Sequence, residues 1–238
     1  MLVTTVGRMK QPTLSKTKYV GGLQCHKLLW YQVNARDQIP PPSEEKAAAF
    51  DRGHHVGALA QSLYPDGKEV DWTNFTRGLA LTKAYMNQRI PVFEAGFRAA
   101  GTHARADILN PVDEDAWDII EVKSVRQVKD VFIRDIAFQR FCYRAAGVNI
   151  GRCFVMHIDP EVTDIDGTPA ESLFSYADVT SEVDAKSVGL AERIVALREV
   201  AGRKDCPDIA MGDHCLEPYA CMMIPLCSGA CSSVNGRA

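Results

Sequence analysis

The sequence predicts an α/β fold with a mixed central sheet, on the evidence of its middle part. Three apolar-rich segments separated by turn residues indicate adjacent strands, over residues 90–99, 102–111 and 117–125. The first two are close enough to form a hairpin around Ala100 and Gly101. Residues 128–147 then show helical spacing, and residues 151–158 have the pattern of a buried strand. A strand, a helix and another strand in this order predict a parallel crossover.

Helices are expected outside this core, over residues 14–32, 43–64, 76–89 and 181–201. Ser15 and Ser43 are good capping residues for the first two of these helices. The adjacent Gly21 and Gly22 are expected to interrupt the first helix, because glycine is unfavourable inside a helix. The tail that follows is too rich in Pro, Gly and Cys to form a regular element.

The length and composition are those of one globular domain, expected over residues 1–238. The chain is 46% hydrophobic and 24% charged, with a formal charge of -3. No apolar stretch is long enough for a secretory signal or a membrane span, which predicts a cytoplasmic protein with no membrane partner. Its 8 cysteines are therefore expected to be thiols, metal ligands or redox groups, since disulfides seldom persist in a reducing compartment.

Charge is unevenly distributed along the chain. Residues 121–152 hold seven Lys or Arg against three acids, whereas residues 159–185 hold eight acids and no base. A basic face of this kind is the electrostatic footprint of a nucleic acid, although a solvated helix surface would give the same pattern. The candidate phosphate contacts are Arg126, Lys129, Arg134, Arg140 and Arg144.

Two of the expected strands carry charged residues that could form a catalytic site. Glu121 and Lys123 point to the same side of their strand, while Val122 points into the core. A neighbouring strand can bring Asp107 to the same place, and two carboxylates suit a hard divalent cation such as Mg²⁺ or Mn²⁺. The lysine could orient a water molecule and stabilise charge on a phosphate. The alternative is an ordinary ion pair between neighbouring strands.

Gln139 and Tyr143 follow on the next helix and share one of its faces, because they are four residues apart. Together with Asp107 and the Glu121-x-Lys123 pair, they resemble the motifs of the PD-(D/E)XK nuclease superfamily in its RecB-like branch. The resemblance implies a restriction-endonuclease-like core and a nuclease in which the carboxylates hold the metal and the lysine acts at the attacking water. It also implies that the Gln and Tyr side chains support the site and contact DNA.

One element of the RecB-like pattern is missing. The family usually has a G-x-x-x-H motif on an upstream helix, but here Gly53 is followed by Gly57 where the histidine would stand. His54 is expected to replace it as a metal ligand, since it lies near the same helix face, with His55 pointing roughly opposite. Glu94 is another possible carboxylate, or else a packing or salt-bridge residue.

The cysteines near the end of the chain suggest a metal centre. Cys215, Cys221 and Cys227 supply three ligands. The arrangement resembles RecB-like nucleases with an iron-sulfur cluster, such as the CRISPR-associated Cas-four exonucleases, which implies Cys25 as the fourth ligand of a [4Fe–4S] cluster. Such a cluster would join residues 14–35 to residues 203–231, with the catalytic core expected over residues 43–200.

Other assignments of the cysteines stay open. Zinc is an alternative metal, although the chain lacks the C-x-x-C pairs that structural zinc sites favour. Cys206 and Cys231 are alternative ligands, and Cys142 and Cys153 lie in apolar stretches as expected core thiols.

These patterns predict a Mg²⁺- or Mn²⁺-dependent DNA exonuclease. The resemblance suggests single-stranded DNA or DNA ends as the substrate, in CRISPR spacer processing, and so antiviral defence, or in DNA repair. CRISPR integration proteins or a separate helicase are the implied partners, because the chain has no phosphate-binding loop of its own. The competing hypothesis is a weakly active or inactive module that binds nucleic acid or serves in assembly.

Overall fold

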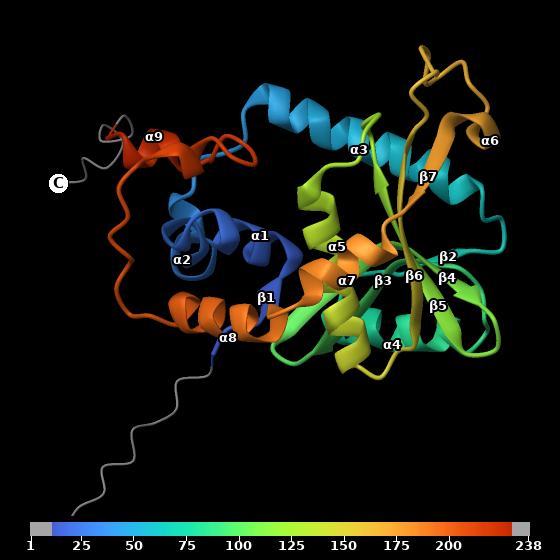
Figure 1. Cartoon of the computed structure of the whole chain (residues 1–238), viewed down its shortest axis with the longest axis horizontal. Helices are drawn as coiled ribbons and strands as arrows, with labels where there is room; N and C mark the ends of the chain where they lie inside the picture. Colours follow the sequence, from blue (N-terminus) through green and yellow to red (C-terminus); the bar gives the residue numbers. More distant parts are fainter. Residues whose placement is uncertain (1–10, 230–238) are drawn as a thin grey trace, which may run out of the picture. The chain divides into compact units, whose positions relative to one another are not determined.

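A computed structural model of the chain describes residues 11–229. The described residues form two compact units, one of Pro42–Leu190 and one that combines residues 11–41 with residues 191–229 (Figure 1). The first unit therefore ends near residue 190, whereas the sequence analysis placed the end of the catalytic core at 200. No helix within residues 11–229 is long and apolar enough to cross a membrane.

The unit Pro42–Leu190 is built on a mixed sheet with the strand order β2-β3-β4-β5-β6-β7. Its strands are β2 (Lys68–Glu69), β3 (Val92–Ala99), β4 (Thr102–Val112), β5 (Ala116–Lys123), β6 (Ile150–Ile158) and β7 (Phe174–Asp178). β3, β4 and β5 are antiparallel neighbours, and β6 runs parallel to β5 after the helix α5 (Asp130–Ala145). The predicted α/β class, hairpin and parallel crossover are confirmed.

Two short edge strands were not predicted. β2 pairs in parallel with β3, and β7 pairs antiparallel with β6. β2 has only 2 residues, too few for a periodic signal. The turn between β3 and β4 consists of Ala100 and Gly101, with φ of 47° and 76°. Positive φ at both central residues is the geometry that joins two twisted antiparallel strands most tightly.

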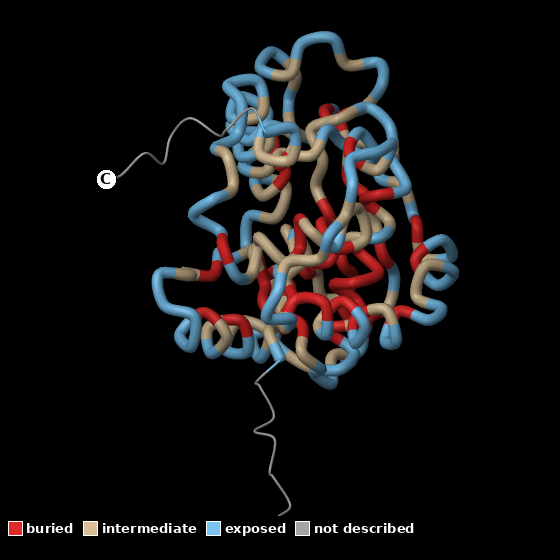
Figure 2. The backbone as a smooth tube through the Cα atoms, turned by 90° about the vertical axis from the view of Figure 1, so that its left-hand side faces the viewer, coloured by how far each residue is buried: buried red, intermediate tan, exposed pale blue. Residues whose placement is uncertain are grey.

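The two faces of β5 are covered by different helices. Ile120 and Val122 pack in a core cluster with Ala60 of α3 (Glu44–Ser62), whereas Glu121 between them contacts Gln139 of α5. Ser43 caps α3 by accepting a hydrogen bond from the backbone N–H of Lys46 at 3.3 Å, as predicted. Buried residues are concentrated on the inner strands and on the inward faces of the helices (Figure 2).

Three further helices complete this unit. α4 (Phe75–Met86) is capped by Asn74 and corresponds to the helix predicted over 76–89. α6 (Ala170–Leu173) precedes β7, and α7 (Thr180–Ser187) packs against α5. The predicted continuous helix over 181–201 is wrong, because α7 ends before Gly189 (φ 67°) and α8 (Leu190–Ala201) begins after it. Glycine adopts this left-handed conformation without the steric cost that other residues meet.

The other unit contains short helices at both ends of the chain. They are α1 (Lys16–Gln24), α2 (His26–Asn34), η1 (Arg36–Gln38), most of α8, η2 (Asp213–Cys215) and α9 (Ile224–Cys227), after the two-residue strand β1 (Leu14–Ser15). The predicted cap at Ser15 is confirmed. The predicted break at Gly21 and Gly22 is wrong, because the chain leaves the helix at Cys25, which is extended with φ -156° and ψ 122°.

The glycines of α1 serve close packing. A Cβ atom on Gly22 would lie 2.8 Å from Leu29 of α2 and 2.9 Å from Leu197 of α8. The missing side chain therefore allows three helices of this unit to approach one another, and this packing offsets the low helix propensity of glycine.

Candidate active site

Three acidic residues stand at neighbouring positions of β3, β4 and β5, and we call them the carboxylate row. They are Glu94, Asp107 and Glu121. Ile108 of β4 pairs with Ile120 of β5. Because these strands are antiparallel, the next residues toward this end of the sheet, Asp107 and Glu121, are also neighbours. The register of β3 against β4 likewise puts Glu94 opposite Asp107. The regular pairing is interrupted at Glu94, whose φ is 54°. A left-handed conformation at a residue other than glycine is strained, and such strain is often found at functional sites.

Glu121 is the centre of this row and is fully buried. Its Oε1 accepts a hydrogen bond from Nζ of Lys123 at 2.6 Å, and its Oε2 accepts one from Nε2 of Gln139 at 2.6 Å. A buried carboxylate is costly unless it is paired and hydrogen-bonded. The lysine and the glutamine supply those partners and hold the carboxylate in one orientation.

Lys123 connects the row to the start of α5. Its Nζ lies 3.8 Å from Oδ2 of Asp135 and 5.2 Å from the ring centroid of Phe132. The side chain is 21% exposed, so the ammonium group is held by two carboxylates and an aromatic face while it keeps access to solvent. This is a suitable position for a group that orients a water molecule.

Asp107 is held by the backbone of the neighbouring strand. Its Oδ2 accepts a hydrogen bond from the N–H of Val122 at 2.7 Å. Val122 stands between Glu121 and Lys123, so this bond fixes Asp107 against the strand that carries the other two side chains. The structure thus brings together Asp107, Glu121 and Lys123, which the sequence analysis selected.

Gln139 and Tyr143 are both fully buried on the face of α5 that meets the sheet. The hydroxyl of Tyr143 donates a hydrogen bond to the carbonyl of Ala95, and its ring lies 4.8 Å from that of Phe97. Burial raises the pKa of Tyr143 well above its ordinary value, so the phenol stays neutral at physiological pH. Oε1 of Gln139 is buried and has no hydrogen-bond partner among residues 11–229.

Glu94 forms an ion pair with an arginine of β4. Its Oε2 lies 3.4 Å from Nη1 of Arg105, and its carbonyl accepts a hydrogen bond from Nε1 of Trp72 at 2.9 Å. The sequence analysis gave this residue as a possible carboxylate or a salt-bridge residue, and the structure shows the salt bridge. The signal in the sequence is one acidic residue inside an apolar strand.

The histidines of α3 are placed differently from the prediction. A hollow beside Ser124, which follows Lys123, is lined on its helical side by Asp51, Arg52, His55 and Val56. His54 is exposed and is not among the lining residues. Val56 is buried and sets the face of α3 that meets the sheet. Around the axis of α3, His55 lies about 100° from Val56 and His54 lies about 200° from it. His54 is therefore on the side of the helix that faces away from the sheet.

His54 therefore faces away from this hollow, and its role as the replacement ligand stays a prediction. His55 points to the hollow, where its Nε2 lies 2.9 Å from Oδ1 of Asp166. Asp166 belongs to the acidic segment 159–185, so this segment closes the hollow opposite α3.

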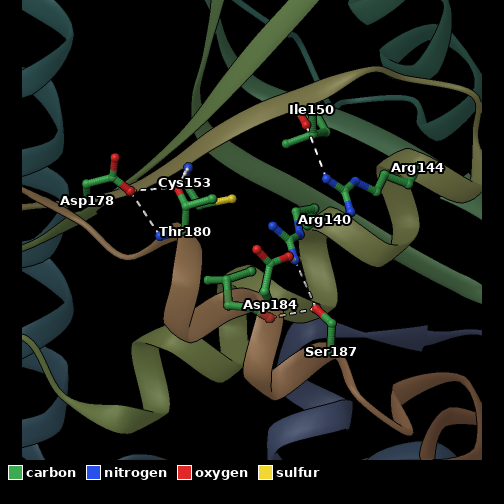
Figure 3. Close-up of polar contacts among 9 residues, drawn as sticks. Arg140, Arg144, Ile150, Cys153, Asp178, Thr180, Asp184 and Ser187 are labelled. Atoms are coloured by element: carbon green, nitrogen blue, oxygen red, sulfur yellow. Dashed lines mark hydrogen bonds and ion pairs between the residues drawn. The ribbon is translucent and has the colours of Figure 1, made fainter.

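Arg140 is not a surface residue, contrary to the prediction that it contacts DNA. It is 2% exposed and forms an ion pair with Asp184 of α7, with Ser187 accepting a second hydrogen bond at 3.3 Å (Figure 3). Because α7 packs over this part of α5, the guanidinium is enclosed between the two helices. Arg140 therefore links α5 to α7 and has no access to a phosphate.

The remaining predicted basic residues are on the surface: Arg126, Lys129, Arg134 and Arg144. Arg134 forms an ion pair with Asp130 at 2.6 Å, and Arg126 donates to the carbonyl of Val162 at 2.9 Å. Arg144 donates to the carbonyl of Ile150 (Figure 3). Their positive charge is thus partly engaged within the protein.

Four cysteines meet in the other unit. Cys25, Cys215, Cys221 and Cys227 line one small hollow together with Lys27, Leu28, Ile209, Ala210, Met211, His214, Met223 and Ile224. Burial raises the pKa of Cys221, and the nearby thiols of the other three raise it further. Soft thiolate ligands in this number fit an iron-sulfur cluster or zinc.

The side chains do not form a finished metal site as they stand. Among residues 11–229 no group of three or more His, Cys, Asp or Glu side chains is arranged to hold a metal ion. Metal binding in the hollow would therefore require these side chains to rearrange. Cys206 is near Cys25 and Cys227, whose charges raise its pKa after the larger effect of burial. Cys231 lies outside the described residues.

The two remaining cysteines are core residues, as predicted. Cys142 and Cys153 are fully buried, and burial raises the pKa of both thiols, that of Cys153 to about 11.

Comparison with known proteins gives distant similarities only. No protein-family model matches the chain, and no curated protein matches it with significance. Among solved structures, an alkaline exonuclease from Laribacter hongkongensis is 13% identical, with a TM-score of 0.41 over 81% of this chain and 92% of that one. A candidate exonuclease from Eubacterium rectale is 14% identical, with a TM-score of 0.44 over 84% and 88%. At this level of similarity the function has to be inferred from the chain's own residues.

Proposed function

We propose that this chain is a nuclease that hydrolyses DNA phosphodiester bonds with Mg²⁺ or Mn²⁺. The observation that carries the proposal is the buried Glu121, held on one oxygen by Lys123 and on the other by Gln139. Asp107 is fixed beside it by the N–H of Val122. An ordinary surface ion pair would need neither the burial nor the second helix.

The donor atoms of this site suit a hard cation. Asp107 and Glu121 offer carboxylate oxygens from adjacent strands, which is the ligand type that Mg²⁺ and Mn²⁺ prefer. A bound cation would stabilise the negative charge that develops on the phosphate. Glu94, across from Asp107, is a third carboxylate within the same row.

The protein's own side chains have separate tasks in this proposal. Lys123 orients the attacking water, since its side chain is 21% exposed and its ammonium group can reach a water molecule. Gln139 keeps Glu121 in position from the opposite side. Tyr143 fixes α5 to β3 through the carbonyl of Ala95, next to Glu94.

The test compares Lys123→Ala with Lys129→Ala on end-labelled single- and double-stranded DNA in Mg²⁺ or Mn²⁺. We expect the first substitution to lower the cleavage rate by about 100-fold or more, as the loss of a positioned catalytic group does. Lys129 is exposed, precedes α5 and is itself a predicted phosphate contact, so its variant measures the smaller loss expected from removing one binding charge outside the catalytic site. Equal products from wild type and Lys123→Ala would overturn the assignment, and Glu121→Gln repeats the test with an isosteric change.

The finer features of the function are proposals that follow from the family resemblance. They are exonuclease action on single-stranded DNA or DNA ends, in CRISPR spacer processing or in repair, with CRISPR integration proteins or a separate helicase as partners. The end-labelled substrate tests the first of these, exonuclease action, because an exonuclease releases label from one end first.

We also propose that the four cysteines hold an iron-sulfur cluster, most simply [4Fe–4S]. The supporting observation is that Cys25 lines the same hollow as Cys215, Cys221 and Cys227, although it is far from them in sequence. A cluster there would join the two chain ends that form this unit. Anaerobic purification followed by iron, sulfide and zinc analysis tests it, and zinc without iron would favour the zinc site instead.

A second candidate function is a nucleic-acid-binding or assembly module with weak or no activity. It is favoured by the exposed position of His54 and by Gly57 at the place of the family histidine. DNA binding without metal-dependent cleavage in the wild type would support it.

A further inference from the structure

An aromatic and basic cluster lies next to the carboxylate row. It consists of Trp72, Phe75, Arg98, His103 and Arg105, and we refer to it as the aromatic–arginine cluster. Arg98 pairs with His103 across β3 and β4, and Arg105 pairs with Gly96. Phe75 is the first residue of α4, and Trp72 precedes that helix. All five belong to the unit Pro42–Leu190.

The three rings of the cluster hold one another in place. The centroid of His103 lies 4.8 Å from that of Phe75 and 5.6 Å from that of Trp72. Trp72 and Phe75 are 5.9 Å apart. A Cβ atom on Gly96 would lie 2.2 Å from the indole of Trp72, so only glycine lets that ring rest on β3. The cluster is therefore firmly built into the sheet.

The positive charge of the cluster comes from its arginines. Cζ of Arg105 lies 5.4 Å from the ring centroid of Trp72, and Cζ of Arg98 lies 5.9 Å from that of Phe75. Burial, with help from both arginines, lowers the pKa of His103 to about 4, so its ring is neutral at physiological pH. The first turn of α4 contains no acidic residue, and its N-terminus adds a partial positive charge.

Three members of the cluster, Phe75, Arg98 and Arg105, are open to solvent. Phe75 is 41% exposed, and the side chain of Arg105 is 45% exposed. An exposed aromatic ring is costly in water, and here it lies beside guanidinium groups that suit phosphate. Arg105 has five N–H donors and can keep its contact with Glu94 while it donates to another anion.

The cluster is also joined directly to the proposed catalytic site. Arg105 contacts the carboxylate of Glu94 at 3.4 Å, and Trp72 donates to the carbonyl of the same residue at 2.9 Å. Two members of the cluster therefore contact the same residue of the carboxylate row, Glu94.

We propose that the aromatic–arginine cluster is a binding subsite for single-stranded nucleic acid, in which a base stacks on Phe75 and an adjacent phosphate contacts Arg105. The proposal rests on the proposed function in taking nucleic acid as the substrate. It selects a single strand because the bases of a duplex are already stacked on each other, whereas an unpaired base can stack on a protein ring. Stacking of this kind does not depend on the base, so the subsite reads no sequence.

The test measures binding in the absence of cleavage. Fluorescence anisotropy with a labelled oligo-dT and an abasic oligonucleotide of the same length is recorded for Lys123→Ala, alone and combined with each further substitution. We expect Lys123→Ala to bind oligo-dT more tightly than the abasic strand, and Phe75→Ala to weaken oligo-dT binding by about 10-fold while leaving abasic binding almost unchanged. Phe75→Leu keeps an apolar side chain without the aromatic face and should behave similarly.

Two further variants separate stacking from charge and from general surface effects. Arg105→Gln should weaken binding of both oligonucleotides. The slope of log affinity against log salt concentration should fall by about one, the value expected for one lost phosphate contact. Tyr176→Ala removes an aromatic residue of similar exposure, 48%, from β7 at the other end of the sheet, and should leave binding unchanged. Circular dichroism checks that each variant is folded.

The outcomes distinguish this subsite from the proposed activity. If the wild type cleaves DNA but Phe75→Ala and Phe75→Leu bind oligo-dT as tightly as their parent, the subsite is wrong and the nuclease stands. If the wild type cleaves nothing but binding depends on Phe75 and Arg105, the subsite stands and the nuclease fails. Equal loss of affinity in Tyr176→Ala, or no binding of single strands at all, would also overturn the subsite.

Discussion

Gln139 donates a hydrogen bond from its Nε2 to Oε2 of Glu121 at 2.6 Å, and both side chains are fully buried. The two residues come from different elements, α5 and β5, so this bond ties the helix to the strand that carries Lys123. It also gives the second oxygen of this buried carboxylate a hydrogen-bond donor. The bond therefore has a structural role and a role in the site.

Replacement of Gln139 by Ala should affect stability and activity together. It leaves Oε2 of Glu121 buried without this donor, which costs about 1–3 kcal/mol in the free energy of unfolding. Urea unfolding measures the loss, and cleavage assays below the transition measure the activity of the folded fraction. Gln127→Ala is the matched control, because Gln127 is exposed in the turn after β5. Equal stability of the two variants would contradict the importance of this bond.

Tyr143→Phe should change how stability depends on pH. Burial raises the pKa of Tyr143 in the folded protein, whereas the unfolded chain titrates near the ordinary value of about 10. The stabilising effect of the neutral phenol is complete below pH 10 and is lost as the pH rises above it. Each such group lowers the free energy of unfolding by up to about 1.4 kcal/mol per pH unit in that range.

The measurement is urea unfolding of wild type and Tyr143→Phe between pH 9 and pH 11. The variant should lose less stability over this interval, although it starts lower because the carbonyl of Ala95 has lost its donor. Identical slopes for the two proteins would mean that Tyr143 ionises normally in the folded state. The ring contact with Phe97 is kept in the variant, so packing is little changed.

Asp184→Ala should destabilise the packing of α7 on α5. The substitution leaves the guanidinium of Arg140, which is 2% exposed, without its carboxylate partner. A buried charge that loses its partner costs about 2–4 kcal/mol. Asp166→Ala removes an 83% exposed carboxylate and should cost less than about 1 kcal/mol. Thermal and urea unfolding of the two variants give the comparison.

DNA binding by Asp184→Ala and Asp166→Ala tests whether Arg140 takes part in DNA binding. The folded fraction of Asp184→Ala should bind DNA as the wild type does, since Arg140 is enclosed and takes no part in binding. A gain in affinity on removal of Asp184 would show instead that the freed arginine reaches a phosphate.

Cys25→Ala should release the proposed cluster as completely as Cys221→Ala. Both thiols line the same hollow, and a four-ligand cluster tolerates the loss of neither. The measurement is iron and sulfide per chain after anaerobic purification. Cys153→Ala is the control, because Cys153 belongs to the unit Pro42–Leu190. Unchanged iron in Cys25→Ala would move the fourth ligand to Cys206, which is nearby, or to Cys231.

Local pattern was enough to predict most of the fold. Short apolar-rich segments between turn residues predicted the three antiparallel strands, and Ser15 and Ser43 predicted two helix starts. These features depend on neighbours in sequence, so a single chain reveals them. The prediction failed at Gly21, Gly22 and Gly189, because the effect of a glycine depends on what packs against it and on its own φ.

The sequence by itself determined which residues could form a nuclease-like site, because Asp107, Glu121, Lys123, Gln139 and Tyr143 resemble known nuclease motifs in type and order. Only the tertiary structure decided which other side chains meet them. Glu94 joins the row through the pairing of β3 with β4, and α7 encloses Arg140. The physical reason is that burial and charge pairing depend on segments distant in sequence, whereas strand and helix periodicity depends on adjacent residues.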